Sequence, residues 1–507
     1  METRTIGKNS VEASPESDLS LVFRNALVYT CEGGSRVTDV ALSGDHIVEV
    51  GDVFRPAKRV IDAQGLALSP GFIDMHNHTD FYLRNLYRGS PEREDLPNAI
   101  RLAHNYVAQG VTTIVTGNCG VGFLEFATWE RIFTGGGFGS NVCHLVPYES
   151  LLEASARAGR TGDARTIVTN LAAQIKAGAA GFSTALGSAI QSRASQDEIL
   201  SYCTVLRDAH RIYVTHVRGE SGRTVLQSID ESINVAIRSA VPVHLSQWRV
   251  LRPYEEGLAE EMSDTLERAQ GQGIRISASQ NPYGTVAQGL DRAYVSYLLA
   301  GNDSPLGIDE SITEGTFERI LREIPAHDIH VVQHAAKPKL RGRNLEEIAL
   351  ESQKTPPQIM VEFYASNPPP YLVVKMMGDR ELQKLMRSTI LTSSNGEVVH
   401  PNETHVHPRS YGTFPRRLAM CGGLMDDVIE SMTVRPAELL GLDGRGRIRP
   451  DYYADLVLFD PRCISYQVDY ADSKKYPAGI RMVTVNGDVV YEDGGFVGGP
   501  SGRLLRS

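Results

Sequence analysis

Hydrophobic and polar positions alternate with a period of two near both ends of the chain. Residues 19–68 and 443–507 consist of short runs of this kind, which are typical of half-buried strands. Gly44-Asp45 and Asn486-Gly487 are two-residue hairpin signals inside these runs. The pattern predicts that the two separated segments build one small β-sandwich together.

The middle of the chain, residues 69–442, alternates short apolar runs with amphipathic stretches. Apolar side chains recur at i, i+3 and i+4 in residues 197–211 and 224–240, as on a helix that covers a core. Repeated strand–helix units predict a parallel sheet closed as a (β/α)8 barrel. Residues 284–326 are too rich in loop formers for a plain barrel unit, and we expect them to form an inserted lid.

Composition narrows the class of protein further. The 507 residues carry 51 basic and 61 acidic side chains, a net charge of −10, which disfavours a broad nucleic-acid interface. Apolar runs stay shorter than the ~20 residues of a membrane span, so no membrane partner is expected. The first 18 residues form a polar segment, expected to be a disordered lead-in without an export signal. Six cysteines in a chain this long suit a reducing compartment, so we expect a cytoplasmic protein. We expect it to be a monomer or a small homo-oligomer.

Candidate metal ligands stand where apolar runs end. His76 and His78 lie two residues apart, so a strand would point both imidazoles to one face. Cys119 and His216 end two further strand candidates, and thiolate and imidazole are the ligands that zinc prefers. Solvated loop histidines, a buried inert cysteine and a structural histidine are the alternatives for these residues.

The ordered set of segments resembles a known family. PGFIDMHNHTD, QGVTTIVTGNCG, GAAGFSTAL, YVTHVRGE, HVHPRSYGTFPRRLA and IRPDYYADLVLFDP follow one another as in the amidohydrolase superfamily, within its N-acyl-D-amino-acid deacylase (D-aminoacylase) branch. The resemblance implies a distorted (β/α)8 TIM barrel with a small β-sandwich formed by both chain ends. It also implies hydrolysis of an amide or lactam C–N bond by a zinc-activated water.

The resemblance assigns roles to particular residues. It implies a small-molecule substrate that bears a carboxylate, and our leading hypothesis is one zinc ion per chain in place of a pair. The ligand positions matched are His76, His78, Cys119 and His216. On the substrate side, Arg409 matches a carboxylate-binding position, Arg249 falls where the family has a lysine, and Tyr283 lies near the acyl group.

Two positions depart from the family pattern. Gln247 stands where a metal-binding histidine ends the sixth strand, and His244, three residues earlier, is expected on the opposite face. Asn395 replaces the aspartate that shuttles the proton, and an amide cannot accept a proton near neutral pH. Losing a general base typically costs ~10²–10⁴-fold in rate.

Substitutes for that base can be named from the sequence. Glu397 and the histidines at 400, 405 and 407 follow Asn395 closely, although the family motif itself has histidines near 405 and 407. His334 ends another strand candidate, where the family has a small residue, and we take it with Asn395 as a candidate catalytic residue. Glu149 marks one more strand end that differs from the family.

Three functions therefore remain open. The first is a zinc-dependent amidohydrolase of the D-aminoacylase type. The second is the same scaffold used for a non-hydrolytic reaction, such as cyclisation, condensation, isomerisation or acyl transfer, since the proton shuttle is missing. The third is a non-catalytic binding protein, which the retention of all four metal-ligand types disfavours.

Overall fold

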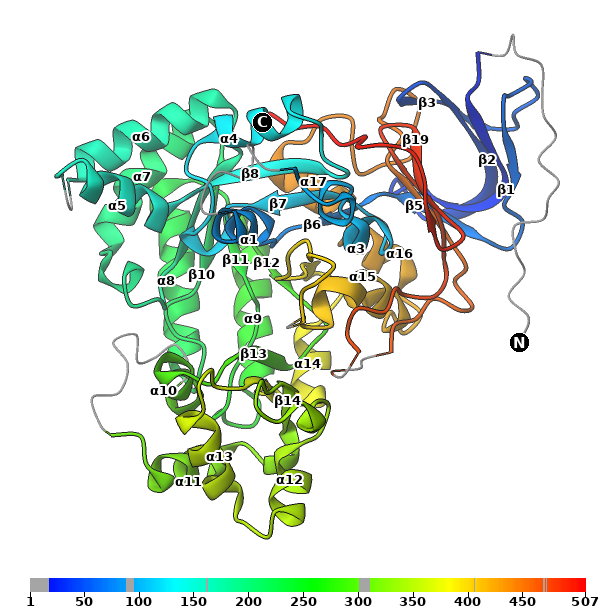
Figure 1. Ribbon diagram of the computed structural model, residues 1–507. Coiled ribbons are helices and arrows are strands. Elements are labelled where there is room, and N and C mark those ends of the chain that lie inside the picture. Colours follow the sequence, from blue (N-terminus) through cyan, green and yellow to red (C-terminus); the bar gives the residue numbers. More distant parts are fainter. Residues whose placement is uncertain are drawn as a thin grey trace.

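The computed structural model describes residues 18–87, 95–160, 163–300, 311–404, 406–467, 470 and 472–507. Nearly all of the expected lead-in lies outside these ranges. Within them the chain forms an α/β barrel, a β-sheet domain beside it and a smaller insert (Figure 1).

An eight-stranded parallel sheet curls into the nearly closed barrel, so the predicted (β/α)8 fold is confirmed. In chain order its strands are β6 (Phe72–Asp74), β7 (Val111–Thr116), β8 (Asn141–Pro147), β9 (Gly181–Ala185), β10 (Ile212–His216), β11 (Val243–Ser246), β12 (Ile276–Gln280) and β16 (Leu391–Thr392). The carboxyl ends of the first and last strands are joined by backbone bonds, because the Asn395 amide donates to the His76 carbonyl and the His78 amide to the Gly396 carbonyl.

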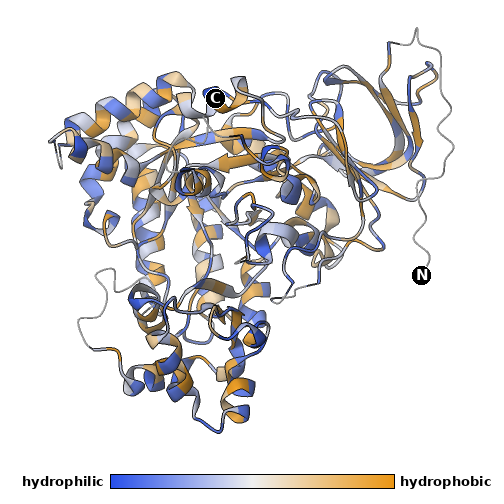
Figure 2. Cartoon of the chain, in the orientation of Figure 1, coloured by the Kyte–Doolittle hydropathy of each residue, from blue (hydrophilic) through white to orange (hydrophobic). Residues whose placement is uncertain are grey.

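Helices cover the outside of the barrel. They are α1 (Thr79–Leu86), α2 (Asn98–Arg101), α3 (His104–Val107), α4 (Phe126–Thr134), α5 (Tyr148–Arg157), α6 (Ala164–Ala177), α7 (Gln196–Asp208), α8 (Thr224–Ser239), α9 (Leu258–Gly271), α14 (Asp379–Leu385), α15 (Arg409–Ala419), α16 (Met425–Glu430) and α17 (Val434–Leu440). The amphipathic stretches predicted at 197–211 and 224–240 are α7 and α8. Figure 2 shows hydrophilic and hydrophobic bands alternating along these helices, as expected when one face packs on strands.

Both chain ends share one nine-stranded sheet beside the barrel. It contains β1 (Leu21–Tyr29), β2 (Ser35–Ser43), β3 (His46–Gly51), β4 (Val60–Asp62), β5 (Ala67–Pro70), β17 (Leu456–Phe459), β18 (Ile480–Val485), β19 (Asp488–Glu492) and β20 (Gly495–Phe496). Antiparallel pairing of β5 with β17 joins the two ends, and Figure 1 shows the blue strands of the first segment beside the orange and red strands of the last. The sheet folds over a core in which Phe23 and Leu42 cluster with Leu456 and Met482.

The two predicted hairpins are present in this sheet. Gly44 and Asp45 connect β2 to β3, and Asn486 and Gly487 connect β18 to β19. Asn486 and Gly487 have φ of 48° and 85°, the left-handed pair that a type I′ turn requires.

The insert between β12 and β16 has its own sheet and its own core. The antiparallel strands β13 (Thr285–Gly289), β15 (Tyr371–Lys375) and β14 (Ile329–Gln333) pair in that order, with α10 (Arg292–Ala300), α11 (Glu314–Glu323), α12 (Leu345–Glu351) and α13 (Pro356–Ala365) packed around them. It extends well past residue 326, and residues 301–310 of the expected lid lie outside the described ranges.

Residues 329–336, the strand candidate that carries His334, do not form one of the barrel strands that the alternating pattern of the middle of the chain predicts. They contain β14, which pairs antiparallel with β15 in the insert. A short apolar run has the same pattern in a barrel and in a satellite sheet, so the sequence could not distinguish the two.

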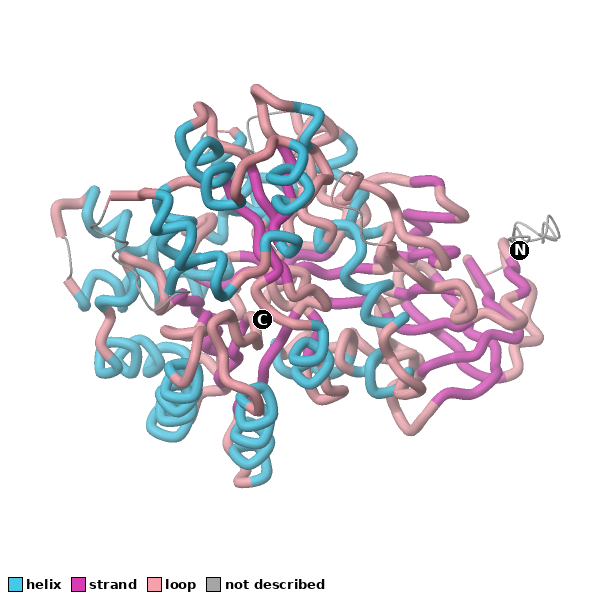
Figure 3. Tube along the Cα trace, turned by 90° about the horizontal axis from the view of Figure 1, so that it is seen from below, coloured by secondary structure: helices cyan, strands magenta, loops and turns pink. Residues whose placement is uncertain are grey.

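Figure 3, seen from the insert's side, shows helices around the barrel strands, whereas the strands of the nine-stranded sheet lie at the edge of the molecule near the N label. Within the described ranges, every helix is too short or too polar to cross a membrane.

Candidate metal centre

The candidate ligands meet at the carboxyl ends of three barrel strands. His76 and His78 follow β6, Cys119 follows β7, and His216 is the last residue of β10. Active sites of (β/α)8 barrels lie at this end, because the loops that follow the strands converge there.

His76, His78 and Cys119 form a compact group of donor atoms, and His216 approaches this group at Cys119. His76 Nε2 and His78 Nε2 lie 3.1 Å apart, Cys119 Sγ lies 3.3 Å from His76 Nε2, and 3.7 Å separates Cys119 Sγ from His216 Nδ1. Zinc bonds of ~2.1 Å to nitrogen and ~2.3 Å to sulfur at tetrahedral angles place ligand atoms roughly 3.3–3.7 Å apart. One donor atom each from His76, His78 and Cys119 lies within 4.8 Å of the others. This donor set fits zinc.

The electrostatics of the cluster favour a thiolate. Burial alone raises the pKa of the Cys119 thiol, but the imidazoles of His76, His216 and His78 hold it well below its usual range. Burial lowers the pKa of His76 to about 4, although Cys119 opposes this. Neutral imidazole and thiolate are the forms that bind a metal ion.

Neighbouring strands hold the loop that carries Cys119. Its backbone is left-handed, with φ of 55°, and the Ser183 hydroxyl accepts a hydrogen bond from the next amide, that of Gly120, at 3.1 Å. Gln191 Nε2 donates to the Cys119 carbonyl at 2.9 Å and to Glu149 Oε2 at 3.1 Å. Glu149 thus supports this loop. The sequence assigned no role to Gln191, nor to Ser183 within the segment GAAGFSTAL.

His216 has a carboxylate partner. Its Nε2 lies 2.8 Å from Oε1 of Glu220, a fully buried residue. Burial lowers the pKa of His216, but Glu220 and Cys119 outweigh it and raise the value to about 9. Sequence reasoning passed over Glu220, although a carboxylate four residues after a candidate ligand was a usable signal.

Arg249, predicted to bind substrate, is bonded to Glu220. Its Nε and Nη2 donate to the two carboxylate oxygens of Glu220 at 2.7 and 3.1 Å, and Nη2 also donates to the Tyr297 hydroxyl at 3.3 Å. Its side chain is buried beside His216, away from bulk solvent.

Both positions that depart from the family lie at the cluster. Gln247 Nε2 lies 4.0 Å from Cys119 Sγ, and Asn395 Oδ1 lies 2.9 Å from His78 Nε2. Both residues are left-handed, with φ of 59° and 52°. Both ring nitrogens of His244 are occupied: Nδ1 and Nε2 are each hydrogen-bonded, at 2.9 Å, to the hydroxyls of Ser277 and Ser279.

On the substrate side, Arg409 begins α15, and its buried Nε has no hydrogen-bond partner among the described residues. Burial raises the pKa of nearby Glu397, while the charges of Arg409 and His78 oppose the increase. Tyr283 is 4% exposed, beneath the Arg416 guanidinium and edge-on to His407. His407 bonds to Thr285 and to the Arg409 amide, as a scaffold of this loop does.

His334 lies in the insert, just after β14. Its ring packs edge-on against Phe363, 5.2 Å away, and its Nδ1 is buried without a hydrogen-bond partner in the described part of the chain. Its described contacts do not join it to the metal cluster. His400 accepts from the Asn402 amide, and His405 lies outside the described residues.

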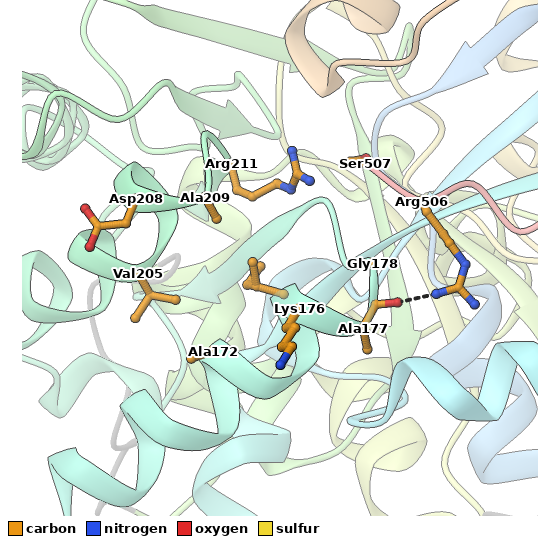
Figure 4. Close-up of a pocket in the computed structure, with 11 residues that line it drawn as sticks. Ala172, Lys176, Ala177, Gly178, Val205, Asp208, Ala209, Arg211, Arg506 and Ser507 are labelled. Carbon is orange, nitrogen blue, oxygen red and sulfur yellow. Dashed lines mark hydrogen bonds between the residues drawn. The ribbon is translucent and has the colours of Figure 1, made fainter.

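A separate pocket of about 670 Å³ lies at the opposite end of the barrel. Figure 4 shows it between α6, α7 and the last residues of the chain, where Arg506 donates to the Ala177 carbonyl. Gly178 and Arg211 in its wall precede β9 and β10, whereas the metal ligands follow their strands. The pocket is therefore not part of the site.

The fold and site define a (β/α)8-barrel protein with a cluster of zinc-type ligands, and comparison with known proteins shows what the chain is similar to. Residues 408–491 match the model of the amidohydrolase family. D-aminoacylase of Alcaligenes xylosoxydans xylosoxydans is 28% identical over 93% of this chain and 94% of its own. The chain is thus similar to the amidohydrolase family in residues 408–491 and to D-aminoacylases over nearly its whole length, as the sequence motifs indicated.

Solved structures agree with this. A crystal structure of D-aminoacylase covers 96% of this chain and 100% of its own, with a TM-score of 0.77 and 27% identity. N-acyl-D-glutamate deacylase from Bordetella bronchiseptica, complexed with zinc and a phosphonate inhibitor, covers 97% and 100% at the same TM-score and 22% identity. The curated relatives are hydrolases of amide C–N bonds, which confirms the predicted enzyme class.

Proposed function

We propose that this protein is a zinc-dependent amidohydrolase that acts on an amide or lactam C–N bond of a small, N-acyl amino acid-like substrate bearing a carboxylate. The observation that carries the proposal is the group of His76, His78 and Cys119 donor atoms within 4.8 Å of one another, with His216 Nδ1 3.7 Å from Cys119 Sγ. Relatives that act on N-acyl-D-amino acids support the substrate class.

The chain's own residues account for binding and orientation. His76, His78, Cys119 and His216 would hold one zinc ion, which when bound polarises a carbonyl and lowers the pKa of water. Arg409 presents a guanidinium whose buried Nε has no described protein acceptor, so a substrate carboxylate can occupy its fork. Tyr283 packs edge-on against His407, whose ring accepts a hydrogen bond from the Arg409 amide.

Proton transfer is where the site departs from its relatives. Asn395 can orient a group through Oδ1 but cannot accept a proton. The charges of nearby Arg409 and His78 lower the pKa of the Glu397 carboxyl group, against the increase that burial causes. We propose that any hydrolysis by the wild-type chain uses Glu397 as the proton acceptor.

The test begins with metal analysis and Asn395→Asp. We expect about one zinc per chain, and a gain of ~10²–10⁴-fold in hydrolysis of N-acyl amino acids when the carboxylate is restored. Mass spectrometry would detect the added water, and equal zinc content in both proteins is the control. Purified wild-type protein that is well folded and binds no zinc would contradict the proposal.

Glu397→Gln separates the two candidate bases. If Glu397 accepts the proton, the substitution reduces residual wild-type hydrolysis by ~10²-fold or more and has little effect in the Asn395→Asp background. Equal loss in both backgrounds would show that Glu397 serves binding or structure instead.

A non-hydrolytic reaction is the second candidate, and the amide at position 395 is the observation that favours it. A scaffold that binds metal and a carboxylate but lacks the shuttle suits cyclisation, condensation, isomerisation or acyl transfer. Two results together would support a non-hydrolytic reaction over hydrolysis. The protein would convert a carboxylate-bearing amide or lactam without adding water, and Asn395→Asp would not hydrolyse N-acyl amino acids faster than the wild type.

A further inference from the structure

We infer that Arg249 and Glu220 are positioning residues for the metal centre: they fix the imidazole of His216 and, through Tyr297, connect it to the insert. The inference rests on the proposed function only in requiring a metal ion at the cluster. It does not depend on which reaction follows.

Glu220 determines which ring nitrogen of His216 keeps its hydrogen and which one is available to a metal ion. A carboxylate only accepts hydrogen bonds, so the 2.8 Å contact places the ring hydrogen on Nε2. Because Glu220 holds the hydrogen on Nε2, Nδ1, 3.7 Å from Cys119 Sγ, is the nitrogen that a metal ion can bind, in place of the proton that this nitrogen carries in the imidazolium form. Loss of this partner would let the ring rotate or change tautomer.

Arg249 in turn fixes the plane of the Glu220 carboxylate. Two guanidinium nitrogens meet the two carboxylate oxygens at 2.7 and 3.1 Å, and both side chains are at least nine-tenths buried. A lysine would offer a single ammonium in place of this rigid fork. The arginine therefore restrains rotation of Glu220, and with it the position of His216.

The same guanidinium reaches the insert. Its Nη2 donates to the hydroxyl of Tyr297 on α10 at 3.3 Å. The backbone strengthens this link, because the Leu251 amide donates to the Glu220 carbonyl at 2.8 Å and Leu251 packs in the core of the insert. Docking of the insert thus stabilises the position of a metal ligand.

This arrangement divides the two arginines between different tasks. Arg249 is committed to Glu220 in a buried site, so the substrate carboxylate is left to Arg409. Substitution of Arg249 should therefore weaken metal binding before it weakens substrate binding.

The experiment measures metal affinity of the purified full chain by competition with a chromophoric chelator, and the absorption spectrum of the Co²⁺-loaded protein. We expect Glu220→Gln to weaken zinc binding by ~10–100-fold, Arg249→Lys by about 10-fold and Tyr297→Phe by less. The Co²⁺ ligand-field bands should shift in Glu220→Gln and Arg249→Lys, because the ligand geometry changes.

Arg218→Lys is the matched control. Arg218 lies two residues after His216 and forms the same kind of fork with Glu231, at 3.1 and 2.9 Å, but contacts carbonyls of Ser192 and Ala194 rather than the cluster. Its zinc affinity and Co²⁺ spectrum should match the wild type.

The outcomes separate this inference from the proposed function. Wild-type zinc binding without any hydrolysis would contradict the proposed hydrolase and leave the affinity series informative. Unchanged zinc affinity and spectrum in Arg249→Lys, or a raised KM alone, would overturn the inference and return Arg249 to substrate binding. If Arg249→Lys fails to fold, unchanged affinity in both Glu220→Gln and Tyr297→Phe would overturn it equally.

Discussion

Cys119, Gln247 and Asn395 all stand on left-handed backbone, each just past the end of a barrel strand. This conformation costs an ordinary L-residue ~1–2 kcal/mol, and asparagine tolerates it best. The turn lets each side chain point back over the barrel mouth instead of following the alternation of its strand. The rule that strand neighbours face opposite ways therefore does not apply to Gln247, and the structure had to show where its amide lies.

Cys203 gives a pH prediction. It is fully buried on α7, and burial raises the pKa of its thiol from 9.0 to about 12, with Ser239 opposing. Between those values the folded protein retains a proton that the unfolded chain has lost. The unfolding free energy should therefore fall as pH rises from about 9 to 12, by ~1.4 kcal/mol per pH unit from this group.

Urea unfolding of wild type and Cys203→Ala at pH 8 to 11 measures this. At pH 8 the unfolding free energy of the variant should be about 1 kcal/mol lower, because the substitution leaves a small cavity. Above pH 9 its unfolding free energy should decline less steeply with pH than that of the wild type. Parallel declines in the two proteins would contradict the assignment to Cys203.

Local signals in the sequence predicted the elements that local chemistry determines. Both hairpins follow from residues that accept positive φ, and α7 follows from its apolar spacing and from the Ser195 and Glu198 capping box. The His76 and His78 spacing predicted one metal-facing pair, because both belong to a single strand end. Each of these features depends on neighbours within a few positions.

Features that depend on distant partners could not be predicted in the same way. Glu220 and Arg249 lie 29 positions apart, and Gln191 and Cys119 lie 72 apart. Nothing in either local pattern reveals a bond that only the closed barrel creates. His334 illustrates the converse error: its strand reads like a barrel strand, but pairing with β15 places it in the insert.

The β-sheet domain and the barrel share a hydrophobic core. Val457 and Val483 of the sheet cluster with Phe72, Val111 and Trp129 of the barrel and its helices. Because apolar burial is the main stabilising term of folding, a continuous core couples the two parts thermodynamically. We expect them to unfold together rather than as separate domains.

The segment after Pro500 tests this coupling, because it crosses between the two parts. The Val142 amide of β8 donates to the Arg503 carbonyl, and the Leu505 amide donates to the Val142 carbonyl. Leu504 packs against the two largest clusters of the barrel, one of which includes the sheet residues. Replacing both leucines by alanine removes part of ~1.5–3 kcal/mol of burial at each. Calorimetry should show one transition moved to lower temperature, while Ser501→Ala leaves it within a degree or so. Two separate transitions, with only one of them shifted, would show that sheet and barrel are independent units.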